Sequence, residues 1–269
     1  MAKASPAPLT VELLIGQIAG NLNFVHNTDA LHLVSLGGSA NSFGSEDIGG
    51  RLTNLKISGD AALYINGDLD NSFQDATPVT IDASANTKGV DLQLSGSETV
   101  TFIGSVGDDS FKVQTSDASD LVAGNRDDSV TIVDTSGNNH YAVESTTIAV
   151  TVGNGNNNIE LDGQFAQITA GNGNNTVAVA NNASFETISV TVGNGNNAIN
   201  TDDSETVNIT AGNGKNVISS VRGESVTIVA GNGGNNVTVS AEDIHITTGT
   251  GNDTITVSGM GSTDIGGDA

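Results

Sequence analysis

Apolar residues alternate with polar ones through the second half of the chain, at fixed offsets from a repeated glycine-asparagine turn. Positions five, three and one before each turn's leading glycine are nearly all apolar, and small or polar residues stand between them. A period of two sends successive side chains to opposite faces, which predicts a β-strand with one buried face. The leading glycines are Gly153, Gly171, Gly193, Gly212, Gly231 and Gly249.

A second, shorter strand is expected after each turn, because an apolar residue stands six positions after every leading glycine. The glycines are 18, 22, 19, 19 and 18 residues apart. Self-similarity at a short period is typical of stacked repeats, in which one repeat alone cannot bury its apolar face. The pattern therefore predicts an all-β fold, a right-handed parallel β-roll or β-solenoid with about 19 residues per coil.

The turn residues predict a stacked corner. Glycine supplies a positive φ and lets backbones approach closely, which a tight corner repeated from coil to coil requires. An asparagine stands four residues after each leading glycine, and identical amides on stacked strands form hydrogen-bonded ladders. The expected ladder consists of Asn157, Asn175, Asn197, Asn216 and Asn235, followed by Asp253.

These turns resemble the repeats-in-toxin (RTX) nonapeptide G-G-x-G-x-D-x-U-x, which folds as a calcium-binding parallel β-roll. The best matches are the segments 104–112 (GSVGDDSFK) and 248–256 (TGTGNDTIT), and a poorer match covers 123–131. The segments 80–111 and 205–212 also resemble the strand-rich part of bacterial S-layer proteins that carry such repeats. The resemblance covers roughly residues 50–258 and implies calcium ligands at Asp109, Asp128 and Asp253.

The chain departs from this family where asparagine replaces the calcium-binding aspartate in the five repeats between Asp128 and Asp253. A neutral amide ladder needs no cation to hold like charges together, so the middle of the solenoid is expected to fold without calcium. Any calcium is expected between the coils of Asp109 and Asp128 or near Asp253, where oxygen ligands suit a hard cation. Alternatively, these aspartates are turn residues that bond the local backbone.

The N-terminal segment has a different pattern, with apolar residues at a helical spacing in 9–25. The expectation is an arm and amphipathic helix in 1–27, which either caps the first coil or docks onto a partner. Irregular coils are expected in 28–150, regular coils in 151–258 and a polar tail in 259–269. The docking residues of the helix would be Val11, Leu14, Ile15, Ile18 and Leu22.

Composition limits the partners. The net charge is −23, with only 8 Lys and Arg, which argues against nucleic acid. There is no cysteine, so disulfides and thiol chemistry are excluded. No apolar run is long enough to insert into a membrane, and the N-terminus lacks a convincing signal-peptide layout.

Two further columns follow from the repeat. Glu186, Glu205, Glu224 and Glu242 each stand seven residues before a leading glycine and predict an acidic row at the second corner. A threonine column two residues before the glycine predicts an exposed strand face. Its partner column is too irregular for the paired threonines of ice-binding solenoids. Carboxylates do not cluster with Arg or Lys, so an enzyme is not expected.

The sequence favours a non-catalytic structural protein displayed on an external surface, with no cofactor other than calcium. The leading hypothesis is a virion surface component, such as a phage head decoration or fibre-like protein. The alternatives are an S-layer or RTX-like secreted cell-surface protein that assembles with calcium, and an adhesin-like binding module. In each case we expect a homo-oligomer, for which a trimer is one arrangement, within a larger assembly such as a capsid or surface lattice.

Overall fold

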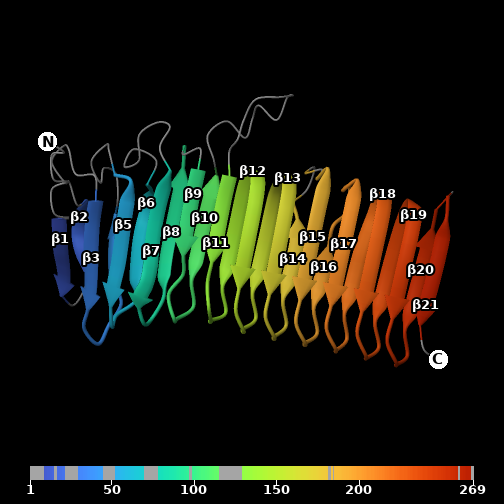
Figure 1. Ribbon diagram of the computed structural model, residues 1–269. Helices are drawn as coiled ribbons and strands as arrows, with labels where there is room; N and C mark the ends of the chain where they lie inside the picture. The colour runs from blue at the N-terminus through green and yellow to red at the C-terminus, as the bar shows by residue number, and fades with distance from the viewer. Residues whose placement is uncertain are drawn as a thin grey trace, which may run out of the picture.

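The computed structural model describes residues 9–14, 17–21, 30–44, 52–69, 78–96, 99–114, 129–180, 183, 185–259 and 261–267. Throughout these residues the regular secondary structure is β-strand, and 21 strands join in one sheet (Figure 1). All pairings between strands are parallel, which confirms an all-β parallel solenoid of about 19 residues per coil.

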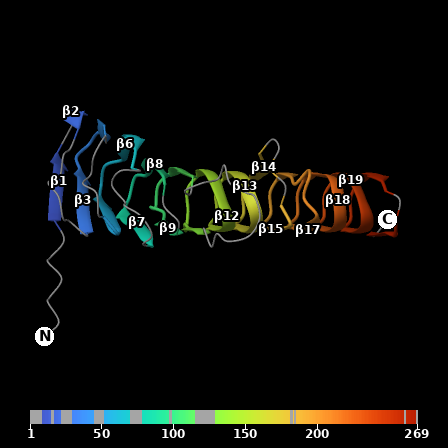
Figure 2. The same cartoon turned by 90° about the horizontal axis from the view of Figure 1, so that it is seen from above.

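The strands form two walls that face each other along the molecule (Figure 2). The first wall contains β1 (Leu9–Leu14), β3 (Ala30–Leu36), β5 (Asn54–Gly59), β7 (Val79–Asn86), β9 (Thr99–Ile103), β11 (Ser129–Val133), β15 (Thr187–Val192), β17 (Thr206–Ala211) and β21 (Thr263–Gly267). The second wall contains β2 (Gln17–Asn21), β4 (Asn41–Gly44), β6 (Leu63–Asp68), β8 (Val90–Ser95), β10 (Ser110–Gln114), β14 (Thr176–Val179), β16 (Ala198–Asn200) and β20 (Thr254–Ser258).

Four longer strands belong to both walls. They are β12 (His140–Val152), β13 (Asn158–Ala170), β18 (Val217–Ala230) and β19 (Asn236–Thr248). Each begins on the second wall and ends on the first: β12, for example, pairs with β10 through its first half and with β11 through its second. The chain therefore turns two corners in each coil. The Gly-Asn corner leads from the first wall to the second, and the second corner leads back.

The register keeps equivalent repeat positions on top of one another. Thr151, Thr169, Thr191 and Thr210 follow in sequence along the first wall. The register is kept even across the 22-residue interval, because its additional residues lie between β14 and β15, at the second corner. Coil length can thus vary at this corner without disturbing either wall.

The core lies between the two walls and is filled by the inward residue of each alternating pair. Ile159 and Ile168 are 0% and 1% exposed, and each such burial contributes about 1.5–3 kcal/mol. Where the irregular coils meet the regular ones the core becomes aromatic. The rings of Phe102 and Phe111 stack with centroids 4.5 Å apart, and Tyr141 packs edge-on at 6.1 Å from Phe102.

The prediction of a helix in 9–25 is wrong for the described part of that segment, which forms β1 and β2. β1 pairs along its whole length with β3, from Leu9 opposite Leu31 to Leu14 opposite Leu36. An open strand edge offers backbone hydrogen bonds, and β-branched residues together with Gly16 and Gly20 disfavour the competing helix. Of the expected docking residues, Val11 and Leu14 lie in β1 and Ile18 in β2, whereas Ile15 and Leu22 lie outside the described residues.

The segment 259–269, expected to be a polar tail, also contains a strand. β21 pairs in parallel with the first-wall part of β19, with Ile244 opposite Thr263 and Thr248 opposite Gly267. Apart from Ile265, its residues are small or polar, and they still continue the first wall, because a parallel ladder requires only backbone groups.

Candidate functional site

The Gly-Asn corner is the most regular feature of the molecule, and two glycines with different tasks shape it. The second glycine of each turn adopts a positive φ, 145° at Gly155 and at Gly195. The leading glycine is needed for close approach: a Cβ on Gly153 would lie 1.8 Å from the carbonyl oxygen of Thr135 in the coil before. Both positions therefore exclude a side chain, and successive corners stack in backbone contact.

One buried column of carboxamides joins these corners. The Nδ2 group of each asparagine donates to Oδ1 of the next, at 2.9 to 3.2 Å, from Asn139 onwards. We call this column the inner ladder; its members are Asn139, Asn157, Asn175, Asn197, Asn216, Asn235 and finally Asp253. Its asparagines are at most 2% exposed, so these bonds form away from water, where an unpaired amide would be costly.

Each inner amide also closes its own corner. The Nδ2 group of Asn197 lies 3.1 Å from the carbonyl oxygen of Gly193 and 3.2 Å from that of Gly195. The backbone N–H of the same residue donates to Oδ1 of Asn216 at 3.4 Å. One side chain thus holds the turn within its coil and the contact between coils.

Two outer rows of asparagines, which the sequence reasoning did not include, run along the exposed side of the corner. In both rows Oδ1 of one coil accepts the backbone N–H of the next, as Asn194 does from Asn213 and Asn196 from Lys215. The inner ladder runs in the opposite sense, with Oδ1 accepting from the coil before. Every G-N-G-N-N turn contains three asparagines, so the sequence could have predicted three stacked rows.

Asp109, predicted as a calcium ligand, occupies an inner position of the same stack and is 2% exposed. Its Oδ1 accepts the N–H of Val90 at 2.9 Å and the hydroxyl of Ser105 at 2.7 Å. Its Oδ2 accepts the N–H of Ser105 at 2.6 Å. The carboxylate oxygens that calcium would require are thus bound to donors of the protein itself.

A second buried carboxyl, Asp134, lies against Asp109 and was not predicted. It takes the inward position that Val152 and Ala170 fill in later coils, and the two carboxyls share a hydrogen bond. The hydroxyl of Tyr141 donates to Oδ2 of Asp134 at 2.5 Å. We call these three residues the buried carboxylate cluster.

Burial controls the ionisation of this cluster. Burial, with a smaller contribution from the charge of Asp134, raises the pKa of Asp109 to about 6 against the opposing effect of the Ser105 and Val90 hydrogen bonds. Burial likewise raises the pKa of Asp134, although the Tyr141 hydroxyl acts in the other direction. The pKa of Tyr141 is raised by its own burial and by both carboxylates. Burial therefore favours the protonated form of both carboxyl groups, whereas the hydrogen bonds that they accept favour the ionised form.

The other predicted metal ligands are not brought together with Asp109. Asp128 lies outside the described residues. Asp253 is half-buried at the end of the inner ladder, where its Oδ1 accepts both the N–H (2.8 Å) and the Nδ2 group (2.9 Å) of Asn235. Within the described ranges, no three His, Cys, Asp or Glu side chains gather in a way that would hold a metal ion.

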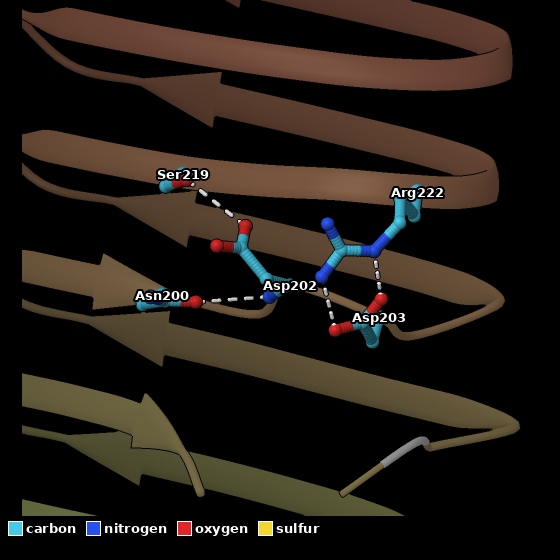
Figure 3. Close-up of polar contacts among 5 residues, drawn as sticks. All are labelled: Asn200, Asp202, Asp203, Ser219 and Arg222. Carbon is cyan, nitrogen blue, oxygen red and sulfur yellow. Dashed lines mark hydrogen bonds and ion pairs between the residues drawn. The ribbon is translucent and has the colours of Figure 1, made fainter. Parts of the chain in front are cut away.

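The second corner carries an acidic row. Glu186, Glu205 and Glu224 are exposed, and backbone bonds join their coils, as from the N–H of Glu224 to the carbonyl of Glu205 at 2.9 Å. Beside them Arg222 forms a two-pronged ion pair with Asp203 (Figure 3). Both residues have positive φ, 68° and 66°, and neither is glycine.

A groove on the second wall is lined by two carboxylates. Glu144 and Asp162 are adjacent in register, and Lys112 also lines the groove. Burial, then the charge of Asp162, raises the pKa of Glu144 against the opposing charge of Lys112. Burial also raises the pKa of Asp162.

The described residues include no helix that is both long and apolar enough to cross a membrane. No protein-family model, no curated protein and no solved structure matches this chain.

Proposed function

We propose that this protein is a non-catalytic structural element, a stiff rod presented on the outside of a larger assembly. The inner ladder is the observation that carries the proposal. Its buried amides follow one another at 2.9 to 3.2 Å through the regular coils, so each coil is fixed to both of its neighbours. The polar residues described at this corner bond one coil to the next, which is a structural role.

The outer surface supports presentation to solvent. A net charge of −23 favours solubility, and the glutamates of the acidic row are exposed along the second corner. Because the chain has no cysteine, its integrity does not depend on the redox state of the compartment. Among external assemblies, we propose a virion surface such as a phage head or fibre, because a stiff acidic rod can project from a particle into solvent.

Microscopy of the native protein tests this proposal. An antibody raised against the purified chain would be applied, with gold label, to particles and cells of the organism that encodes it. Label on the outside of assembled particles is the expected result. Label confined to the cytoplasm, or purified chains that image as compact particles instead of rods, would contradict the proposal.

One observation favours a second candidate, an RTX-like or S-layer-like protein that assembles with calcium. Asp253 ends the inner ladder as a half-buried carboxylate instead of an amide, within one of the best matches to the RTX repeat. Under this candidate, a chelator would dissolve assemblies and lower the β-signal in circular dichroism. The saturated carboxylate of Asp109 leads us to expect no change in that signal.

A further inference from the structure

The middle part of the first wall has an outward face without charge. In the strands β9, β11, β15 and β17 and the first-wall parts of β12, β13 and β18, every outward residue is uncharged. Most are threonine or serine, as in β15, where Thr187, Ser189 and Thr191 point outward. We call this surface, formed by the outward residues of these strands, the neutral face. It is unexpected in a chain with a net charge of −23.

Charge is present on the surfaces around the neutral face. The acidic row of the second corner borders the part of this face formed by β15, β17 and β18, and the second wall exposes Asp91 and Glu160. The neutral face instead exposes apolar groups: Val133, Phe165 and Val229 are 40%, 39% and 41% exposed. Exposed apolar groups on a charge-free surface are characteristic of the core of a protein–protein interface.

We propose that the neutral face binds the same face of a second copy, with the two rods parallel. Two copies of so acidic a chain repel each other wherever their carboxylates face one another. The neutral face lets the copies approach without bringing carboxylates together. The inference rests on the proposed function, because it names the partner of the rod. The same patch on both partners requires a two-fold axis.

Charge also selects the direction of that axis. A two-fold axis across the rods would place both acidic rows on the same edge of the dimer and concentrate negative charge there. A two-fold axis along the rods places the acidic row of one copy opposite the Gly-Asn corner of the other, whose outer rows are mainly neutral asparagine. With the axis along the rods, the coils of the two copies run in the same direction. Each residue near the middle of the face then lies opposite the same residue of the other copy.

The size of the face fits a reversible dimer. Seven strands spaced by roughly 4.8 Å and about five residues wide cover roughly 30 Å by about 17 Å. The dimer would bury on the order of 1,000 Å² in total, near the lower limit for a specific interface. We therefore expect association that depends on concentration over the micromolar to millimolar range.

Crosslinking tests the orientation, because the chain has no native cysteine. Thr227→Cys places one thiol at the middle outward position of β18, at one end of the neutral face. Packed sheets lie about 10 Å apart, so a short bis-maleimide is the suitable crosslinker. Parallel rods give a covalent dimer from this variant. The matched control, Thr238→Cys on the exposed side of the second wall, should give none.

Light scattering tests the face itself. The wild-type chain is expected to reach twice its mass of 27.0 kDa at high concentration. Thr169→Glu with Thr210→Glu should keep the chain monomeric, whereas Thr176→Glu with Thr238→Glu, on the second wall, should not. Circular dichroism checks that both variants fold. A wild-type monomer at every concentration, a trimer, or equal crosslinking of both cysteine variants would overturn the inference. If the inference fails but the gold label is found on the outside of particles, the proposed function still holds.

Discussion

At the scale of single residues, the buried carboxylate cluster should make stability depend on pH. Burial raises the pKa of Asp109 to about 6 and also raises that of Asp134. A carboxyl whose pKa is raised by folding stabilises the protein while protonated, and this contribution is lost as pH rises through the folded-state pKa. The free energy of unfolding should therefore fall as pH rises from about 4 to about 7, and Asp109 alone should account for on the order of 2 kcal/mol.

Asp134→Asn should remove much of this dependence. The new amide can donate to the Asp109 carboxylate while its oxygen still accepts from Tyr141, so no shared proton is needed. Urea unfolding followed by circular dichroism should show a flatter pH profile and higher stability near pH 8. Asp91→Asn changes the charge equally at an exposed position and serves as control. A variant with the wild-type slope would show that the cluster does not govern this pH range.

Neighbouring asparagines of one corner should differ sharply in their effect on stability. Asn197→Ala removes the side-chain donor to the buried Gly193 and Gly195 carbonyls and one buried acceptor of the Asn175 Nδ2 group, at a cost of about 2–4 kcal/mol. Asn196→Ala removes one exposed acceptor for the N–H of Lys215, and about 0.5–1 kcal/mol is expected. Chemical denaturation of the two variants measures both values. Equal losses would mean that the inner ladder contributes no more than the outer rows.

At the scale of strands and corners, the effect of a broken corner should stay local. Gly195→Ala forces a side chain onto a φ of 145° and places its Cβ 1.9 Å from the Gly173 carbonyl oxygen. Since each coil of a solenoid contacts only its neighbours, hydrogen exchange should accelerate in β14 to β18 and stay unchanged in β5 to β8. Gly234→Ala, whose Cβ would meet nothing closer than 3.2 Å, is the control. Uniform acceleration along the chain would indicate one cooperative unit instead.

The same scale explains which elements the sequence could predict. The strands of the regular coils were predictable because inward residues keep fixed offsets from a glycine that cannot be replaced. The N-terminal segment was not, since its apolar spacing suits a helix or a strand, and pairing with β3 decides between them. Asp134 escaped notice because only the register shows that it stands where Val152 later stands in the core. The three asparagines of each G-N-G-N-N turn indicate the outer rows, but only the structure shows in which direction their hydrogen bonds run from coil to coil.

At the scale of the whole molecule, like charge opposes the stacking that the corners enforce. Glu186, Glu205 and Glu224 lie above one another, because the register of the first wall places the residues that follow them opposite each other. Carboxylates at the spacing of adjacent strands repel, and salt screens this repulsion over a Debye length of about 8 Å at physiological ionic strength. Added salt should therefore raise the midpoint of thermal unfolding.

Glu205→Gln, at the centre of the acidic row, should reproduce part of that effect without salt. We expect a gain of about 0.5–1 kcal/mol at low ionic strength that disappears at high ionic strength. Glu160→Gln is the matched control, because its register neighbours Ala142 and Ala178 carry no charge. Thermal unfolding of the three proteins across a salt series would separate the contributions. If both variants gain the same stability, net charge alone opposes folding. A gain in stability confined to Glu205→Gln locates the repulsion in the stacked row, where the fold itself holds the carboxylates together.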